Sequence, residues 1–175
     1  GRPMALNLMK HQHDLTVFAR REASLGPLVE GGAATADSPA AVAAGCDVVF
    51  TMLTGTEDVE SVILGADGIA EGARPGTVVI DTSTIAPART RMIGEQLEED
   101  RIDFLDAPVS GGPQGAKDAS LSIMVGGKVE VLDRIRPLLN CIGTKVLHMG
   151  GQGAGQGQGA AVGGHGRGRQ GGSDQ

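Results

Sequence analysis

Aromatic side chains are nearly absent from this sequence. Its 175 residues contain no Trp, no Tyr and only Phe18, Phe50 and Phe104. Proteins that bind single-stranded nucleic acids stack the bases on aromatic rings, so this class of function is disfavoured. The net charge of −6 points the same way, because an acidic surface does not attract a polyanion. We therefore expect no nucleic-acid partner.

Long apolar runs and closely spaced cysteines are also missing. No stretch of about 18 apolar residues could cross a membrane, and the sequence does not start with a basic segment followed by an apolar run. Cys46 and Cys141 lie far apart, each within an apolar stretch, as core thiols do. These absences predict no membrane partner, no metal site and a reducing, cytoplasmic location.

What the sequence does contain is an alternation of short apolar runs with segments of helical periodicity. This pattern is typical of a parallel sheet buried between helices, so it predicts an α/β fold. The predicted strands are Leu15–Phe18, Ala33–Thr35, Asp47–Leu53, Thr77–Asp81, Ile102–Asp106, Leu121–Val125 and Lys145–Met149. The predicted helices are Pro3–Lys10, Pro39–Ala44 behind a Ser38 cap, Thr56–Leu64, Pro87–Glu99 and Val129–Leu139, the last bent or ended by Pro137.

The last 26 residues have a different composition. Residues 150–175 hold 12 of the 29 glycines and no Leu, Ile, Phe or Met. Such a segment buries too little apolar surface to offset the entropy cost of ordering it. We expect one folded domain over residues 1–149 and a disordered Gly-rich tail over residues 150–175.

Two segments, DVVFTMLTG (47–55) and GTVVIDTSTIAP (76–87), end an apolar run in small polar residues, at the edge where open α/β sheets bind ligands. A third segment is DAPVSGGPQGAKDASLSIMVGG (106–127). In its turn, Ser110, Gly111 and Gly112 offer a hydroxyl and bare backbone N–H groups that could hold a small carboxylate. The opening, GRPMALNLMK, then a strand ending in Arg20 and Arg21, resembles the second half of a Rossmann unit.

Together these segments resemble the β-hydroxyacid dehydrogenase family, which includes 3-hydroxyisobutyrate dehydrogenase and tartronate semialdehyde reductase. The resemblance implies a Rossmann-like, doubly wound, mostly parallel sheet that lacks its first strand. It also implies reversible hydride transfer between NAD or NADP and a short β-hydroxyacid or its semialdehyde. By the same resemblance the cofactor-binding positions are Gly1, Arg2, Pro3, Met4, Arg20, Arg21, Met52, Leu53, Ser83 and Thr84, and the substrate-binding positions are Ser110, Gly111 and Gly112. Two guanidinium groups after the second strand suit a 2′-phosphate, which favours NADP over NAD.

The sequence departs from the family at both ends. The family's catalytic lysine follows the GQGAGQ segment (151–156), but Gly159 stands near that position and no lysine follows Lys145. Lys117 and Lys128 read as surface charges, so no catalytic residue is assigned. The family's helical C-terminal domain is also missing, and with it the expected homo-oligomer. The change of composition at Gln156 is what a GC-rich gene read out of frame would produce.

These departures predict little or no turnover and leave alternatives open. One is a non-catalytic protein that keeps the dehydrogenase fold as an interaction module. Another is the NADP-binding domain of a protein like 6-phosphogluconate dehydrogenase, which also carries a serine and two glycines in its substrate loop. The substrate and the choice between NAD and NADP stay undetermined.

Overall fold

A computed structural model describes residues 1–157 of the chain. Its helices are α1 (Arg2–Lys10), the 3₁₀ turn η1 (Glu22–Ser24), α2 (Gly26–Glu30), α3 (Pro39–Ala44), α4 (Thr56–Leu64), α5 (Ile69–Gly72), α6 (Pro87–Glu99), α7 (Gly112–Lys117) and α8 (Val129–Leu139). Its strands are β1 (Thr16–Val17), β2 (Ala34–Thr35), β3 (Val48–Thr51), β4 (Val78–Asp81), β5 (Asp103–Asp106), β6 (Val109–Ser110), β7 (Leu121–Gly126) and β8 (Gly143–Gly150). The alternation of strands and helices confirms the predicted α/β class.

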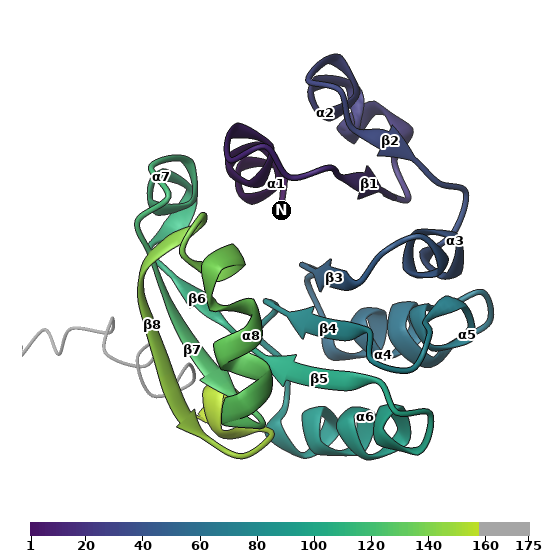
Figure 1. Cartoon of the computed structure of the whole chain (residues 1–175), viewed down its shortest axis with the longest axis vertical. Coiled ribbons are helices and arrows are strands. Elements are labelled where there is room, and N and C mark those ends of the chain that lie inside the picture. Colours follow the sequence, from purple (N-terminus) through teal and green to yellow (C-terminus); the bar gives the residue numbers. More distant parts are fainter. Residues whose placement is uncertain (158–175) are drawn as a thin grey trace, which may run out of the picture.

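The main sheet has six strands and is mostly parallel. Strands β3, β4 and β5 run parallel, so that Thr51, Asp81 and Asp106 stand side by side at their carboxyl ends. Strand β7 runs antiparallel to β5 and β6. Strand β8 pairs parallel with β7 and lies at the outer side of the sheet in Figure 1. Figure 1 shows β1 and β2, which pair parallel with each other, as a small sheet apart from β3.

The core divides into two clusters on opposite faces of the main sheet. One cluster joins α1 and α8 to Ile80 and Leu105. The other joins α3, α4, α5 and α6 to Val79 and Phe104. The side chains of a strand point alternately to its two faces, so continuous apolar strands are what this two-sided burial requires.

Four predicted helices have the bounds read from the sequence, because their start and stop signals are local. The Ser38 hydroxyl caps α3 by accepting a hydrogen bond from the Ala41 N–H at 3.0 Å. Pro137 lies inside α8, which continues to Leu139, so it does not end the helix. Sequence reasoning missed the short elements α2, α5, β6 and α7, because the Gly and Pro residues in or beside them are typical of turns.

The predicted start of the disordered tail at Gly150 is wrong. Gly150 ends β8, and residues 154–157 form a helical turn that packs on the end of β5. The buried Gly155 has space for no Cβ, because that atom would lie 2.8 Å from Asp106 Oδ2. Glycines that composition marks as flexible are here required for close packing. The rest of the predicted tail, residues 158–175, lies outside the described residues.

Three further features of residues 1–157 concern the cysteines, the helix lengths and the metal-binding side chains. Cys46 and Cys141 are both free thiols. No helix among residues 1–157 is long and apolar enough to cross a membrane. Within the same residues, no group of three or more His, Cys, Asp or Glu side chains is arranged to hold a metal ion.

Candidate functional site

The loops that follow β3 and β4 are joined by hydrogen bonds at the carboxyl edge of the sheet. The Leu53 N–H donates to Ser83 Oγ at 2.8 Å, and the Thr82 hydroxyl donates to the Thr51 carbonyl at 2.7 Å. Ser83 is buried by these contacts, whereas Thr84 is exposed. Met52 is 44% exposed although it is a large apolar residue. The two loops therefore form one rigid corner that presents Met52 and Thr84 to solvent.

The start of α1 lies against this corner. A Cβ built on Gly1 would be 3.6 Å from Met52 Cβ, so the first helical turn and Met52 are in contact range. Gly1 is the N-cap of α1 and Pro3 lies in its first turn, where the missing N–H costs no hydrogen bond. Arg2 is exposed, while Met4 is buried in the core. The helix N-terminus thus leaves free backbone N–H groups beside Met52.

Arg20 and Arg21 follow β1 and are both exposed. Arg20 Nη2 lies 3.0 Å from Asp58 Oδ1 of α4, the helix that follows the Met52 loop. This ion pair connects the β1 end to the β3 end of the site. The predicted cofactor positions are therefore linked into one group by contacts from Arg20 through α4 to Met52, Leu53, Ser83 and Gly1.

Ser110, Gly111 and Gly112 lie where β6 passes into α7. Ser110 ends β6, and Gly111 and Gly112 have φ values of 138° and 64°, which disfavour residues with a side chain. The Asn7 side chain of α1 donates to the Ala116 carbonyl of α7 at 2.7 Å. This serine and glycine segment is thus connected to the other positions through α1, and no hydrogen bond within residues 1–157 joins it to Ser83 or Thr84 directly.

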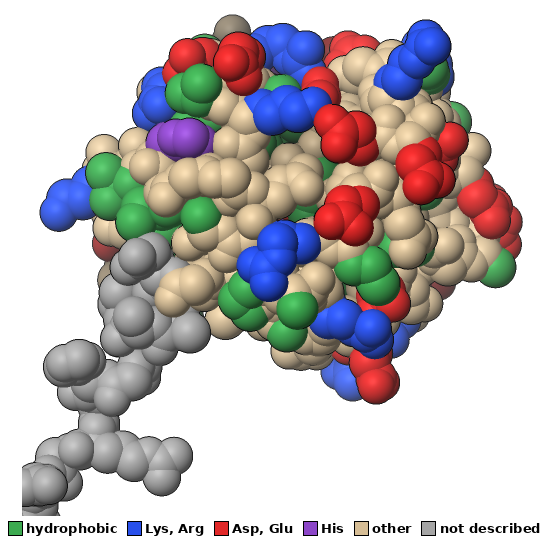
Figure 2. Space-filling model, turned by 90° about the horizontal axis from the view of Figure 1, so that it is seen from below, with side chains coloured by type: hydrophobic (Ala, Val, Ile, Leu, Met, Phe, Trp, Pro, Cys, Tyr) green, Lys and Arg blue, Asp and Glu red, His purple; other side chains and the backbone are tan. Residues whose placement is uncertain are grey.

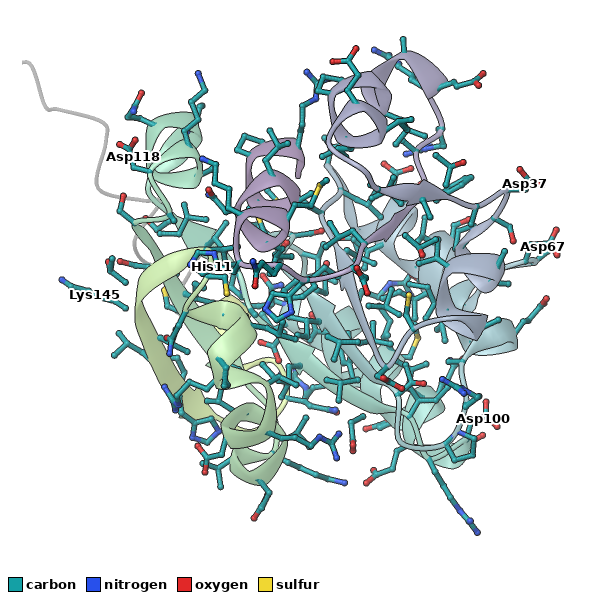
Figure 3. The ribbon with its side chains drawn as sticks, turned by 45° about the horizontal axis from the view of Figure 1, so that its top comes forward. His11, Asp37, Asp67, Asp100, Asp118 and Lys145 are labelled. Atoms are coloured by element: carbon teal, nitrogen blue, oxygen red, sulfur yellow. The ribbon has the colours of Figure 1, made fainter. Side chains whose placement is uncertain are left out.

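The lysines and the surface hollows fall elsewhere. Lys117 and Lys128 are exposed, and Lys128 pairs with Glu98 at 2.8 Å. Lys145 is exposed on β8 and points outward (Figure 3). Gly159 lies outside the described residues. Two hollows, one beside Gln152 and one between α4 and Arg89, contain none of the predicted site residues.

Two aspartates that sequence reasoning did not assign hold this edge together. Asp81 and Asp106 are both 0% exposed and face each other in register on β4 and β5. Asp81 Oδ1 accepts hydrogen bonds from the Thr51 hydroxyl at 2.9 Å and from the Ser83 N–H at 3.1 Å. Each aspartate is the last residue of a predicted strand, Thr77–Asp81 or Ile102–Asp106, and this repeated placement was the signal that could have identified them.

The second aspartate fastens the C-terminal turn. Asp106 Oδ1 accepts from the Gly153 N–H at 2.8 Å and Oδ2 from the Gln156 N–H at 3.1 Å. The buried Gln156 side chain accepts from the Ile85 N–H at 3.0 Å and donates to the Ser83 carbonyl at 2.7 Å. The segments around Ser83 and Gln156 are thereby tied to each other and to β5.

The electrostatics of this pair follow from its burial. Burial raises the pKa of Asp81, and nearby Asp106 raises it further, against hydrogen bonds from Ser83 and Thr51 that lower it. Burial also raises the pKa of Asp106, against backbone hydrogen bonds from Gly153 and Gln156 that lower it. The molecular surface, by contrast, mixes acidic and basic side chains on the face seen in Figure 2.

The chain is similar to known dehydrogenases in both sequence and structure. Residues 1–151 match the family described as the NAD binding domain of 6-phosphogluconate dehydrogenase. The chain is 42% identical over 156 residues to an NAD-dependent L-serine dehydrogenase and, separately, to a 3-hydroxyisobutyrate dehydrogenase, both of Pseudomonas aeruginosa; each match covers 89% of this chain and 52% of the relative. A solved structure of 3-hydroxyisobutyrate dehydrogenase from Mycobacterium tuberculosis with L-serine superposes with a TM-score of 0.86 at 36% identity, covering 91% of this chain and 54% of that one. The chain spans about half the length of these proteins.

Proposed function

Because the chain belongs to the β-hydroxyacid dehydrogenase family, whose members are NAD-dependent dehydrogenases, we propose that it is the nicotinamide-dinucleotide-binding part of such an enzyme. The observation that carries the proposal is the rigid corner at the carboxyl ends of β3 and β4, where the Leu53–Ser83 hydrogen bond holds Met52 beside Gly1. The carboxyl edge of a parallel sheet is where open α/β folds bind ligands. When bound, the nicotinamide would supply or accept a hydride.

The residues at this edge suit a dinucleotide. The free N–H groups at the start of α1 would face the pyrophosphate, with Gly1 allowing its close approach and Arg2 adding positive charge. Met52 and Leu53 would cover the cofactor, and Thr84 would lie near the nicotinamide, positioned by the buried Ser83. Pro3 and Met4 would fix the helix that presents these groups.

For the adenosine end, the two guanidinium groups of Arg20 and Arg21 favour NADP, because arginine binds a 2′-phosphate in a bidentate manner. Asp58 holds Arg20 at this position through an ion pair of 3.0 Å. The similarity to an NAD-dependent L-serine dehydrogenase argues in the other direction. The proposal is therefore a nicotinamide dinucleotide site with a preference for NADP.

The substrate proposed for the intact enzyme is a short β-hydroxyacid or its semialdehyde. Its carboxylate would bind at Ser110, Gly111 and Gly112, where positive φ values expose backbone N–H groups at the start of α7. Gly159 stands near the position of the family's catalytic lysine, so we expect little or no turnover. Cofactor binding does not need that lysine, so we expect it to be retained. A cytoplasmic location is part of the proposal and is supported by the two free thiols.

Cofactor titration tests the proposal. NADPH and NADH are titrated into the wild type, Arg20→Ala, Arg21→Ala and, as a control, Arg74→Ala, whose exposed side chain pairs with Asp47 elsewhere. We expect each of the first two variants to weaken NADPH binding about tenfold or more and to change NADH binding little. Binding of neither cofactor by the folded wild type would contradict the proposal and leave a non-catalytic protein with a dehydrogenase fold. Equal losses for both cofactors would contradict the NADP preference alone.

A further inference from the structure

The buried pair of Asp81 and Asp106 differs from an ordinary buried ion pair, because both members are acids. Neither forms a salt bridge within residues 1–157. The two residues pair in register on adjacent strands, and repulsion between two buried carboxylates favours a proton on one of them. The structure indicates which one.

The hydrogen-bond donors around the two acids are unequal. Both oxygens of Asp106 accept backbone N–H groups, from Gly153 and Gln156, which suits an anion. Asp81 Oδ1 receives two donors, whereas Asp81 Oδ2 is buried and has no partner within the described residues. A bare carboxylate oxygen in that position costs a large desolvation free energy, and a proton on it lowers that cost because a neutral group is cheaper to bury than a charged one.

We propose that Asp81 is a neutral carboxylic acid with its proton on Oδ2, paired with an ionised Asp106, and that this one-proton pair positions the Ser83 corner and the turn at residues 153–156. Asp81 connects Thr51 of β3 to the Ser83 backbone, and Asp106 fixes Gly153 and Gln156. The proposal goes beyond the proposed function and needs no cofactor, so its test can fail independently.

The other groups around the pair do not supply a counter-charge. Thr51 from β3 and Ser83 from the loop after β4 contribute only a hydroxyl and an N–H group. Gly126 from β7 approaches Asp106 with backbone alone. Arg91 of α6 borders Gly153 but forms no ion pair with either carboxyl group. Burial raises the pKa of Asp81, as a neutral Asp81 requires. Burial also raises the pKa of Asp106, but the backbone N–H groups of Gly153 and Gln156 lower it and favour its ionised form.

The test compares isosteric variants across pH. Asp81→Asn keeps an acceptor for Thr51 and Ser83 and places N–H donors where the protonated oxygen stands. Asp106→Asn places an amide NH₂ against the N–H of Gly153 or Gln156. The control is Asp37→Asn, an exposed acid that points outward (Figure 3). Urea unfolding of each chain gives the equilibrium constant for unfolding at each pH.

The sign of the effect is fixed by linkage. An aspartate whose pKa is higher in the folded chain than in the unfolded chain, where it is about 4, binds its proton more tightly in the folded state. The fold therefore loses stability as the pH rises from the unfolded-state pKa to the folded-state pKa. We expect the unfolding constant of the wild type relative to Asp81→Asn to rise by up to about tenfold per pH unit in that window. The ratio of the unfolding constants of the wild type and Asp37→Asn should not change with pH. Asp106→Asn should be less stable than the wild type at every pH.

A direct measurement complements the pH series. The infrared C=O stretch of a protonated carboxyl group should be present near neutral pH in the wild type and in Asp37→Asn, and absent in Asp81→Asn. A wild type without that band would overturn the proposal. So would an Asp81→Asn chain that fails to fold, or one whose stability relative to the wild type does not change with pH.

Discussion

Replacing Gly155 with alanine tests whether the turn at residues 151–157 is part of the folded domain. An alanine Cβ at this position would lie 2.8 Å from Asp106 Oδ2, 3.0 Å from the Asp106 carbonyl oxygen and closer still to the Met124 carbonyl oxygen. Two of these three atoms belong to strand backbone and cannot move away cheaply. The turn must therefore shift off the end of β5.

The cost can be worked from the bonds that the shift breaks. Asp106 would lose the N–H donors of Gly153 and Gln156, at 2.8 and 3.1 Å. Hydrogen bonds to a charged group contribute about 1.5–3 kcal/mol each, so the free energy of unfolding should fall by about 3–6 kcal/mol. With a denaturant slope of about 1–3 kcal/mol per molar urea, the unfolding midpoint should drop by roughly 1 M or more.

The control is Gly151→Ala in the same turn. A Cβ on Gly151 meets nothing within 4 Å, so this variant should stay within about 0.5 kcal/mol of the wild type. If Gly155→Ala unfolds at the same urea concentration as Gly151→Ala, the turn does not pack on Asp106 as described. That result would also remove the basis for placing Gln156 beside Ser83.

Three further predictions concern local features. Removing the α3 cap with Ser38→Ala should lower the free energy of unfolding by about 1 kcal/mol in thermal unfolding, and an unchanged midpoint would mean that the 3.0 Å cap does not contribute. Ile93→Ala empties a site that is 0% exposed and should cost about 2–5 kcal/mol in urea unfolding, whereas Val29→Ala at a 48% exposed site should cost far less; equal costs would contradict the assigned core. Gly111→Ala forces a side chain into φ 138° and to 3.1 Å from Leu121 Cδ2, so calorimetry should show a lower melting temperature than for Gly26→Ala, where a Cβ meets nothing.

The sequence predicted those parts of the fold whose signals are local. Helix α4 at Thr56–Leu64 and helix α6 at Pro87–Glu99 were found with their observed bounds, because acidic first-turn residues and Pro at the start mark a helix within a few positions. That polar residues gather at the carboxyl ends of β3, β4 and β5 was also predicted, since such residues ended the apolar runs. In these cases the information lies within about ten residues.

What the sequence could not show depends on contacts between distant residues. Asp106 and Gln156 are 50 positions apart, and nothing in either segment states that a carboxylate meets a backbone N–H there. The glycines around Gln156 matched a disordered composition equally well. The exposed or buried state of neighbouring positions such as Ser83 and Thr84 also depends on packing, which periodicity does not resolve.

The two hydrophobic clusters meet at β4 and β5, which give Val79 and Phe104 to one and Ile80 and Leu105 to the other. Both clusters thus pack against the same two strands, one on each face. Melting either layer would expose one side of these strands to water and remove the support of the opposite side. The two clusters of the main sheet cannot unfold separately, so heating should produce a single calorimetric peak for them rather than two.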